Sequence, residues 1–234
     1  MIEKADLETY LFLLPNKFLI ILFDTKNLTN YYINEVNLEN KINFIDVNFL
    51  NKFLDENIFK IEKQTGKFIK NIFIVIENNQ IFKFNIGIKK KNYDKLINKK
   101  YLENSLIDIK ELFNENYKDK KIMHIIIDKY LIDGKLHSLP LNNLNGNNFC
   151  LEIQIRSLSA SLTYEIEKVL EKYQIRIIQY LDGNYIRNFF KDSDLDIAQM
   201  THSIKNGINE NEVKLVPKNT KNVGFFEKFF QLFN

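Results

Sequence analysis

The chain has 234 residues, of which 45% are hydrophobic, so it can bury the core of one large domain or two small ones. Its net charge of +3 is too small to require nucleic acid as a partner. The single cysteine, Cys150, excludes an internal disulfide and is typical of a protein from a reducing cytoplasm. We expect no signal peptide, and no apolar run has the roughly 20 residues that cross a bilayer, so we expect any membrane contact to be peripheral.

The first third of the sequence consists of short apolar runs separated by turn residues. Strands are predicted at residues 10–14, 18–23, 31–36 and 42–47. Apolar residues at helical spacing then predict a helix over residues 49–63, and Gly66 marks its end. The apolar run IFIVI, within residues 69–77, is typical of a central strand.

The middle of the chain changes its hydrophobic period repeatedly. Residues 81–88 alternate as a strand does, and residues 102–113 have the pattern of an amphipathic helix. The run KIMHIIIDKYLID predicts a strand, closed by a turn at Asp133-Gly134. Residues 149–156 alternate strictly between apolar and polar side chains, which predicts a strand with one buried face.

A further helix and strand complete this region. The run LSASLTYEIEKVLEKY has apolar residues at helical spacing and either Ser159 or Ser161 as its cap, and QIRIIQY returns to a strand. Together these elements predict a compact layer with a helix packed on one face. Short helices are predicted at residues 184–190 and 195–204, and the polar stretch 205–222 predicts a flexible linker.

The order of segments from residue 49 onward resembles that of the FtsA family of bacterial cell-division proteins, which have an actin-like fold. The segment KIMHIIIDKYLIDG resembles the family's "vlHvipqeYaiD" motif, with His124, Tyr130 and Asp133 in step. The segment LPLNNLNG resembles the family's "nPvGlsG" turn, and LTYEIEKVLEKYQIRI resembles its "naikavercGlkv" helix and strand. The resemblance implies part of the first actin-like subdomain, with an inserted strand–helix–strand–strand module.

The predicted fold class is therefore α+β. The predicted parts are a remnant of the first actin-like subdomain at residues 1–79, the inserted module at 80–181, return helices at 182–204, the linker at 205–222 and an amphipathic helix at 223–234.

The sequence departs from the family where nucleotide phosphates would bind. Two glycine-rich hairpins bind the phosphates in the family through backbone N–H groups. The first hairpin is replaced by LLPNK at residues 13–17, which has neither the aspartate nor the glycine, and the second by DLDI at residues 194–197. The second half of the actin-like fold, which holds the adenosine pocket and the site for the FtsZ tail, has no counterpart. We therefore expect no nucleotide cofactor, and binding of FtsZ in the family's manner is in doubt.

The last dozen residues form an amphipathic pattern when they are placed on a helical wheel at 100° per residue. The apolar half of the wheel holds Val223, Phe225, Phe226, Phe229, Phe230, Leu232 and Phe233. Such a helix packs on the protein's own core or lies in the interface of a bilayer. A polar linker precedes the helix, and Lys221 and Lys228 can approach anionic lipid, so we predict membrane binding. FtsA-like proteins end in a similar linker and helix.

Other chemical signals favour structural explanations. The three histidines, His124, His137 and His202, are far apart in sequence and have no metal-ligand spacing. The acidic residues at 192–196 lack the pattern of a calcium loop and indicate a helix start. The serines at 157–161 have no nucleophile-elbow glycines. The lysine runs lack interleaved aromatic residues and indicate a solvated face. We expect no catalytic residue, no bound metal and no nucleic-acid partner.

The sequence thus predicts a non-enzymatic scaffold at the cytoplasmic side of the bacterial cell membrane, at the division site. Its expected partners are anionic lipid, division proteins that contact the inserted module, and further copies of itself. One alternative is a PilM-like scaffold of a pilus or secretion machine, from a family that also has the inserted module. The others are a basic nucleic-acid-binding module and an ATPase with a cryptic site.

Overall fold

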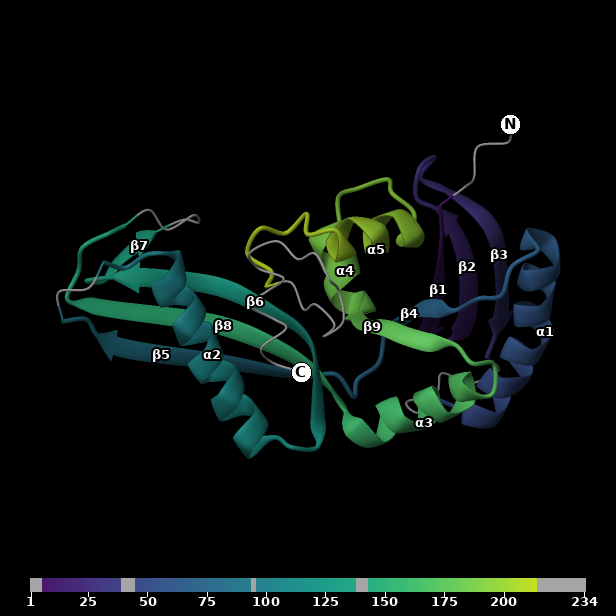
Figure 1. The fold of residues 1–234 in the computed structure, drawn as a ribbon, viewed down its shortest axis with the longest axis horizontal. Helices are drawn as coiled ribbons and strands as arrows, with labels where there is room; N and C mark the ends of the chain where they lie inside the picture. The colour runs from purple at the N-terminus through teal and green to yellow at the C-terminus, as the bar shows by residue number, and fades with distance from the viewer. Residues whose placement is uncertain (1–5, 39–44, 94–95, 138–142, 214–234) are drawn as a thin grey trace. The chain divides into compact units, whose positions relative to one another are not determined.

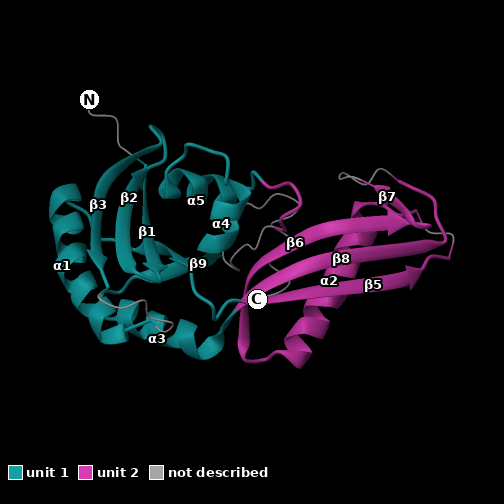
Figure 2. Cartoon of the chain, turned by 180° about the vertical axis from the view of Figure 1, so that it is seen from behind, with its two compact units in different colours: residues 1–81, 158–208 teal, residues 82–157, 209–234 magenta. Residues whose placement is uncertain are grey.

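The structure is a computed structural model that describes residues 6–38, 45–93, 96–137 and 143–213. The chain divides into two compact units, each with its own sheet (Figures 1 and 2). Unit 1 comprises residues 1–81 and 158–208, and unit 2 comprises residues 82–157 and 209–234. Unit 2 is therefore an insertion within unit 1, with an additional segment from the C-terminal side of the chain.

Unit 1 is built around a five-stranded sheet with the order β3-β2-β1-β4-β9. Its strands are β1 (Leu7–Leu14), β2 (Lys17–Asp24), β3 (Thr29–Asn37), β4 (Asn71–Ile76) and β9 (Arg176–Asp182). The first three strands form an antiparallel meander, and β1, β4 and β9 are mutually parallel. Residues 9–14 of β1 and 18–24 of β2 are buried without interruption, as in a sheet that is covered on both faces.

Helices cover both faces of this sheet. The helices of unit 1 are α1 (Val47–Thr65), α3 (Ala160–Glu171), α4 (Gly183–Phe189) and α5 (Ile197–Lys205). Figure 1 shows α1 and α3 on one side of the sheet and α4 and α5 on the other. On the α1 side, the ring of Phe18 lies 5.9 Å from that of Phe49. On the α5 side, the ring of Phe23 lies 5.3 Å from that of His202.

The helix boundaries follow from capping residues. The Asp46 carboxylate accepts a hydrogen bond from the Phe49 amide at the start of α1, and Gly66 ends the helix in the left-handed conformation, with φ 66°. Ser159, one of the two predicted caps, accepts from the Leu162 amide at the start of α3. The strand predicted at residues 42–47 is wrong at its end, because Asp46 caps α1 and Val47 is helical; residues 39–44 lie outside the described part.

Unit 2 is a four-stranded sheet with the order β5-β8-β6-β7 and one helix. Its elements are β5 (Phe82–Lys91), α2 (Lys99–Asn116), β6 (Lys120–Ile132), β7 (Lys135–His137) and β8 (Asn148–Ser159). The core lies between α2 and one face of the sheet, and it includes Leu102, Ile109, Phe113, Ile125, Ile127, Phe149, Leu151, Ile153 and Ile155. The strict alternation predicted for residues 149–156 is confirmed from 149 to 155, whereas Arg156 is also buried.

The chain has the predicted α+β fold, but the parts divide differently from the predicted boundaries. The inserted module was predicted at residues 80–181, whereas unit 2 takes residues 82–157 of that range. Both α3 and β9 belong to unit 1, because β9 pairs in parallel with β4 and α3 contacts α1. The predicted linker also differs at its start. Lys205 ends α5, and Val213 is buried in the core of unit 2.

Candidate functional site

The predicted membrane-binding residues lie outside the described part of the chain. These residues are Lys221, Val223, Phe225, Phe226, Lys228, Phe229, Phe230, Leu232 and Phe233. Among the helices that the structure describes, none has the length and apolar character to cross a membrane. Membrane binding by residues 223–234 therefore stays a prediction.

The turn between β1 and β2 stands where the first phosphate-binding hairpin would lie. Leu14 pairs with Lys17, so Pro15 and Asn16 form a tight two-residue turn. The Lys17 ammonium lies 2.6 Å from the Glu35 carboxylate on the neighbouring strand β3. In the segment at residues 194–197, which replaces the second phosphate-binding hairpin, Asp196 caps α5. Its carboxylate accepts hydrogen bonds from the amides of Ala198 and Gln199. The helix start predicted from this acidic cluster is confirmed.

The carboxyl ends of the parallel strands are the usual place for ligands in an open sheet. Here the Asp182 carboxylate is buried and accepts a hydrogen bond from the Tyr185 amide, which caps α4. Glu77, just after β4, accepts a hydrogen bond from Arg187 of α4. A Cβ atom at Gly183 would lie 2.5 Å from Glu77 Cγ, so this edge is packed tightly by the chain's own side chains.

A charged cluster joins β1 to α5 within unit 1. The Glu8 carboxylate accepts hydrogen bonds from Tyr10 and Lys205, and its Oε2 lies 3.3 Å from His202 Nδ1. Burial raises the pKa of Glu8, but these hydrogen bonds and the charge of Lys205 outweigh it, so the net pKa is lowered. Burial and the neighbouring Glu8 carboxylate raise the pKa of Tyr10. The cluster fixes α5 on the sheet.

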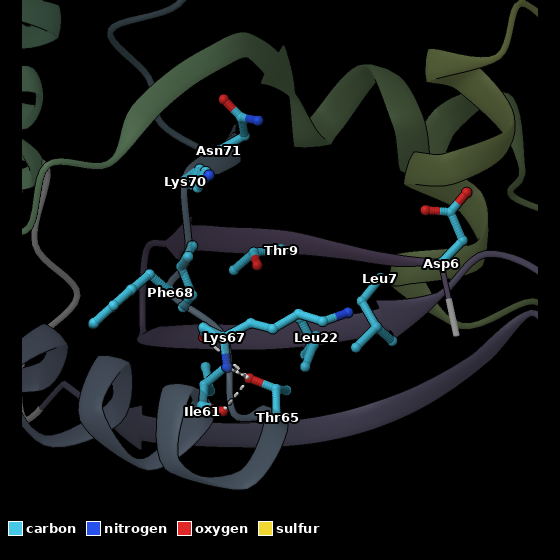
Figure 3. A pocket seen from close by; sticks show the side chains of 11 residues that line it. Asp6, Leu7, Thr9, Leu22, Ile61, Thr65, Lys67, Phe68, Lys70 and Asn71 are labelled. Carbon is cyan, nitrogen blue, oxygen red and sulfur yellow. Dashed lines mark hydrogen bonds between the residues drawn. The ribbon is translucent and has the colours of Figure 1, made fainter. Parts of the chain in front are cut away.

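A pocket of about 530 Å³ lies in unit 1 beside the start of β1. Figure 3 shows side chains from β1, β2, the end of α1 and the loop before β4 around it. Its lining residues are Asp6, Leu7, Thr9, Leu22, Ile61, Thr65, Lys67, Phe68, Ile69, Lys70 and Asn71. The Phe68 side chain is 81% exposed between two lysines of the same loop. The sequence analysis missed this pocket, because its walls come from segments that no local pattern connects.

The face of the unit 2 sheet that points away from α2 is polar. Lys83, Asn85 and Lys89 of β5 are exposed on this face, beside Glu152 and Gln154 of β8. Gln154 Nε2 donates to Asn85 Oδ1 over 3.3 Å, and Lys129 of β6 lies 3.0 Å from Glu152. Cys150 belongs to the same face and is partly exposed.

The histidines occupy three separate environments. His124 is fully buried, with its Nδ1 2.6 Å from Glu212 Oε1. His202 belongs to the Glu8 cluster, and the ring of His137 stacks on that of Tyr130 at 6.4 Å. Within the described ranges, no group of three or more histidine, cysteine or acidic side chains is placed to hold a metal ion. The burial of His124 agrees with the structural explanation that the sequence favours for this residue. Its partner Glu212 gave no sequence signal.

No protein-family model matches the chain, and a search of curated proteins found no match. Among solved structures, a PilM-PilN type IV pilus biogenesis complex is similar at 9% identity and a TM-score of 0.49, over 78% of this chain and 49% of that chain.

Two further solved structures have a TM-score of 0.39 each. A protein from Bacteroides thetaiotaomicron, described as having an actin-like ATPase fold and unknown function, is 15% identical over 83% of this chain and 61% of that chain. The cytoplasmic domain of EpsL, an inner membrane component of the type II secretion system of Vibrio cholerae, is 7% identical over 77% and 57%. The chain thus spans between 49% and 61% of the length of these structures. None of the three is described as a cell-division protein.

Proposed function

We propose that this chain is a non-enzymatic scaffold at the cytoplasmic side of a bacterial membrane. In this proposal, unit 2 presents the surface that binds a protein partner, and residues 223–234 contact anionic lipid. The observation that supports it most directly is the way in which unit 2 is inserted. Phe82 and Ser157, where the insertion leaves and re-enters unit 1, are paired across β5 and β8. Both of these connections lie at one end of the β5–β8 pair, and a third connection joins the units between residues 208 and 209, so the exposed side chains along the rest of β5 stay available for contact.

The polar face of unit 2 is the proposed contact surface. An antiparallel sheet with one packed face and one solvated face is stable in water, so the polar face needs no partner in order to fold. Its side chains carry both charges: Lys83 and Lys89 are exposed, and Glu152 is half-buried. Such a surface fits a transient and polar contact of the kind that regulatory scaffolds make.

Two membrane machines could contain such a scaffold: a pilus or secretion machine, and the division apparatus. In a pilus or secretion machine, the chain would hold a membrane component from the cytoplasmic side; the descriptions of two of the similar structures name machines of this kind. In the division apparatus, it would act at the division site as an FtsA-like protein, which the motif-like segments around His124 and Asp133 support. The inserted module is common to both settings.

Site-specific crosslinking in the native cell tests the contact surface. A photo-reactive amino acid replaces Lys83 or Lys89 on the polar face, and the matched control replaces Lys60, an exposed lysine of α1 in unit 1. We expect the unit 2 positions to capture a component of a membrane machine and Lys60 to capture none. Equal capture at Lys60, or no capture from unit 2, would contradict the proposal. Loss of pili or of secretion on depletion supports the first setting, and filamentous cells support the second.

A non-enzymatic scaffold of this kind neither binds nor hydrolyses nucleotide. Anything that binds the folded state raises the melting temperature by mass action. We therefore expect MgATP at millimolar concentration to leave the melting temperature unchanged, and a rise of several degrees to contradict the proposal.

A further inference from the structure

One edge of β6 is divided between two partners. On this side β7 pairs only with the end of β6, from Tyr130 to Ile132. Beside the middle of β6, at residues 125–127, lie residues 211–213, here called the clamp (Figure 1). The Ile127 amide donates to the Asn211 carbonyl over 2.8 Å, and the Val213 amide donates to the Ile125 carbonyl over 2.9 Å. The clamp is therefore a short antiparallel strand added to a sheet edge.

Two side chains of the clamp, Glu212 and Val213, contact unit 2 on opposite faces of its sheet, and one is acidic whereas the other is aliphatic. Val213 is 4% exposed and belongs to the apolar core between the sheet and α2. Glu212 points to the opposite face, because side chains alternate along a strand. Its Oε1 lies 2.6 Å from Nδ1 of His124, whose side chain is fully buried. The site beside β6 thus accepts a carboxylate on one face and an aliphatic group on the other.

The clamp is also short, so few backbone hydrogen bonds stabilise its position on β6. It has a single residue pair, Ile126 with Glu212, and the two backbone hydrogen bonds that flank it. Two turns connect α5 to the clamp. The Gly207 amide donates to the Ile204 carbonyl in the first turn, and the Glu212 amide donates to the Asn209 carbonyl in the second. A strand of this length cannot be stable through backbone pairing alone, so its position depends on the Glu212 and Val213 side chains.

We propose that the edge of β6 at residues 125–127 is a binding site for an extended peptide in which a glutamate precedes an aliphatic residue. In the structure the chain occupies this site with its own residues 211–213. The partner it fits is a protein segment with the same two side chains, which enters by strand addition when the clamp leaves. A tethered segment acts at an effective concentration in the millimolar range, so the clamp keeps the site closed to weaker ligands.

The test uses the full chain and a fluorescent peptide of residues 208–214, INENEVK. The clamp is opened by the double change Glu212→Gln, Val213→Asp, and binding is followed by fluorescence anisotropy. We expect the opened chain to bind the peptide at least about 10-fold more tightly than the unaltered chain does, because the tethered competitor is gone. A peptide with Glu212→Gln should bind about 10-fold more weakly, and a peptide with Glu210→Gln, at an exposed position, should bind equally well.

An opened chain that is folded by circular dichroism but binds no peptide would overturn the proposal. Equal binding of the Glu212→Gln and unaltered peptides would overturn it as well. If the double change prevents folding, Glu212→Gln alone in the full chain carries the test through hydrogen exchange at the Ile127 amide. We expect this amide to exchange about 10-fold faster than in the unaltered chain, with Glu210→Gln as the control. An unchanged exchange rate in Glu212→Gln would contradict the proposal.

Discussion

The two sheets of this protein differ in how they are covered, and the difference is visible in their strands. The central strands of unit 1 are buried on both faces, and β1 has six consecutive buried residues, from Thr9 to Leu14. In unit 2, β5 alternates between exposed and half-buried residues along nearly its whole length. The sheet of unit 1 is packed between helices, whereas α2 covers only one face of the other sheet. The solvated face of unit 2 is thus free to evolve as a contact surface without loss of the core.

The largest expected effect follows from this difference in burial. Ile74 of β4 is fully buried, so Ile74→Ala leaves a cavity and is expected to lower the free energy of unfolding by about 2 to 5 kcal/mol. Lys83→Ala on the polar face of unit 2 should change it by less than about 0.5 kcal/mol. Urea unfolding followed by circular dichroism measures both. Similar costs for the two changes would contradict the contrast between the sheets.

A smaller effect concerns how tightly unit 2 is packed at one glycine. A Cβ atom at Gly146 would clash with Ile132 Cγ2, so Gly146→Ala is expected to destabilise the protein by about 1 to 3 kcal/mol. The matched control is Gly87→Ala in β5, where the added Cβ meets only Glu152 Cγ, at 3.7 Å. We expect the control to be neutral within about 0.5 kcal/mol. Thermal unfolding of both variants checks the pair, and an equal loss in both would refute the packing argument.

The smallest effect depends on pH and tests the charged cluster of unit 1. The pKa of Glu8 is lower in the folded protein than its ordinary value of 4.5, so ionised Glu8 stabilises the fold above pH 4.5. This contribution is lost as the pH falls through the lower, folded-state pKa. Glu8→Gln should therefore cost about 1 to 2 kcal/mol at pH 7 and progressively less below pH 4.5. The control Glu35→Gln removes a more exposed ion pair and should cost less than about 1 kcal/mol at pH 7.

Urea unfolding at a series of pH values measures this dependence. A constant difference between Glu8→Gln and the unaltered chain from pH 7 to pH 3 would show that Glu8 does not contribute through its charge.

Local periodicity was sufficient to predict most helices and strands. The apolar run IFIVI forms most of β4 in the central sheet of unit 1. Gly66 ends α1 and Ser159 begins α3, as these residue types predict. The sequence did not show where the insertion ends. The run QIRIIQY at residues 174–180 predicts a strand but carries no information about its partner. In the structure, β9 pairs with β4 and not with the inserted sheet.

The contacts that matter most for the proposed sites are also long-range. His124 and Glu212 lie 88 residues apart in sequence, and the polar stretch that contains Glu212 looks like part of a linker. The apolar side chain of Val213 in that stretch was the available signal, since this residue is buried against a sheet edge. The pocket beside β1 needs Thr9, Leu22 and Ile61 to meet, which only the fold decides.

Flotation with vesicles that contain phosphatidylglycerol tests the central claim, a scaffold bound at a membrane, most directly. The full chain is compared with Phe229→Asp, Phe230→Asp, which places two charges on the apolar half of the predicted helix. The control Gln231→Asp, Asn234→Asp places two charges on the polar half. We expect the unaltered chain and the control to float and the phenylalanine variant to remain at the bottom of the gradient. If the unaltered chain does not float, or all three float equally, membrane binding by residues 223–234 is wrong.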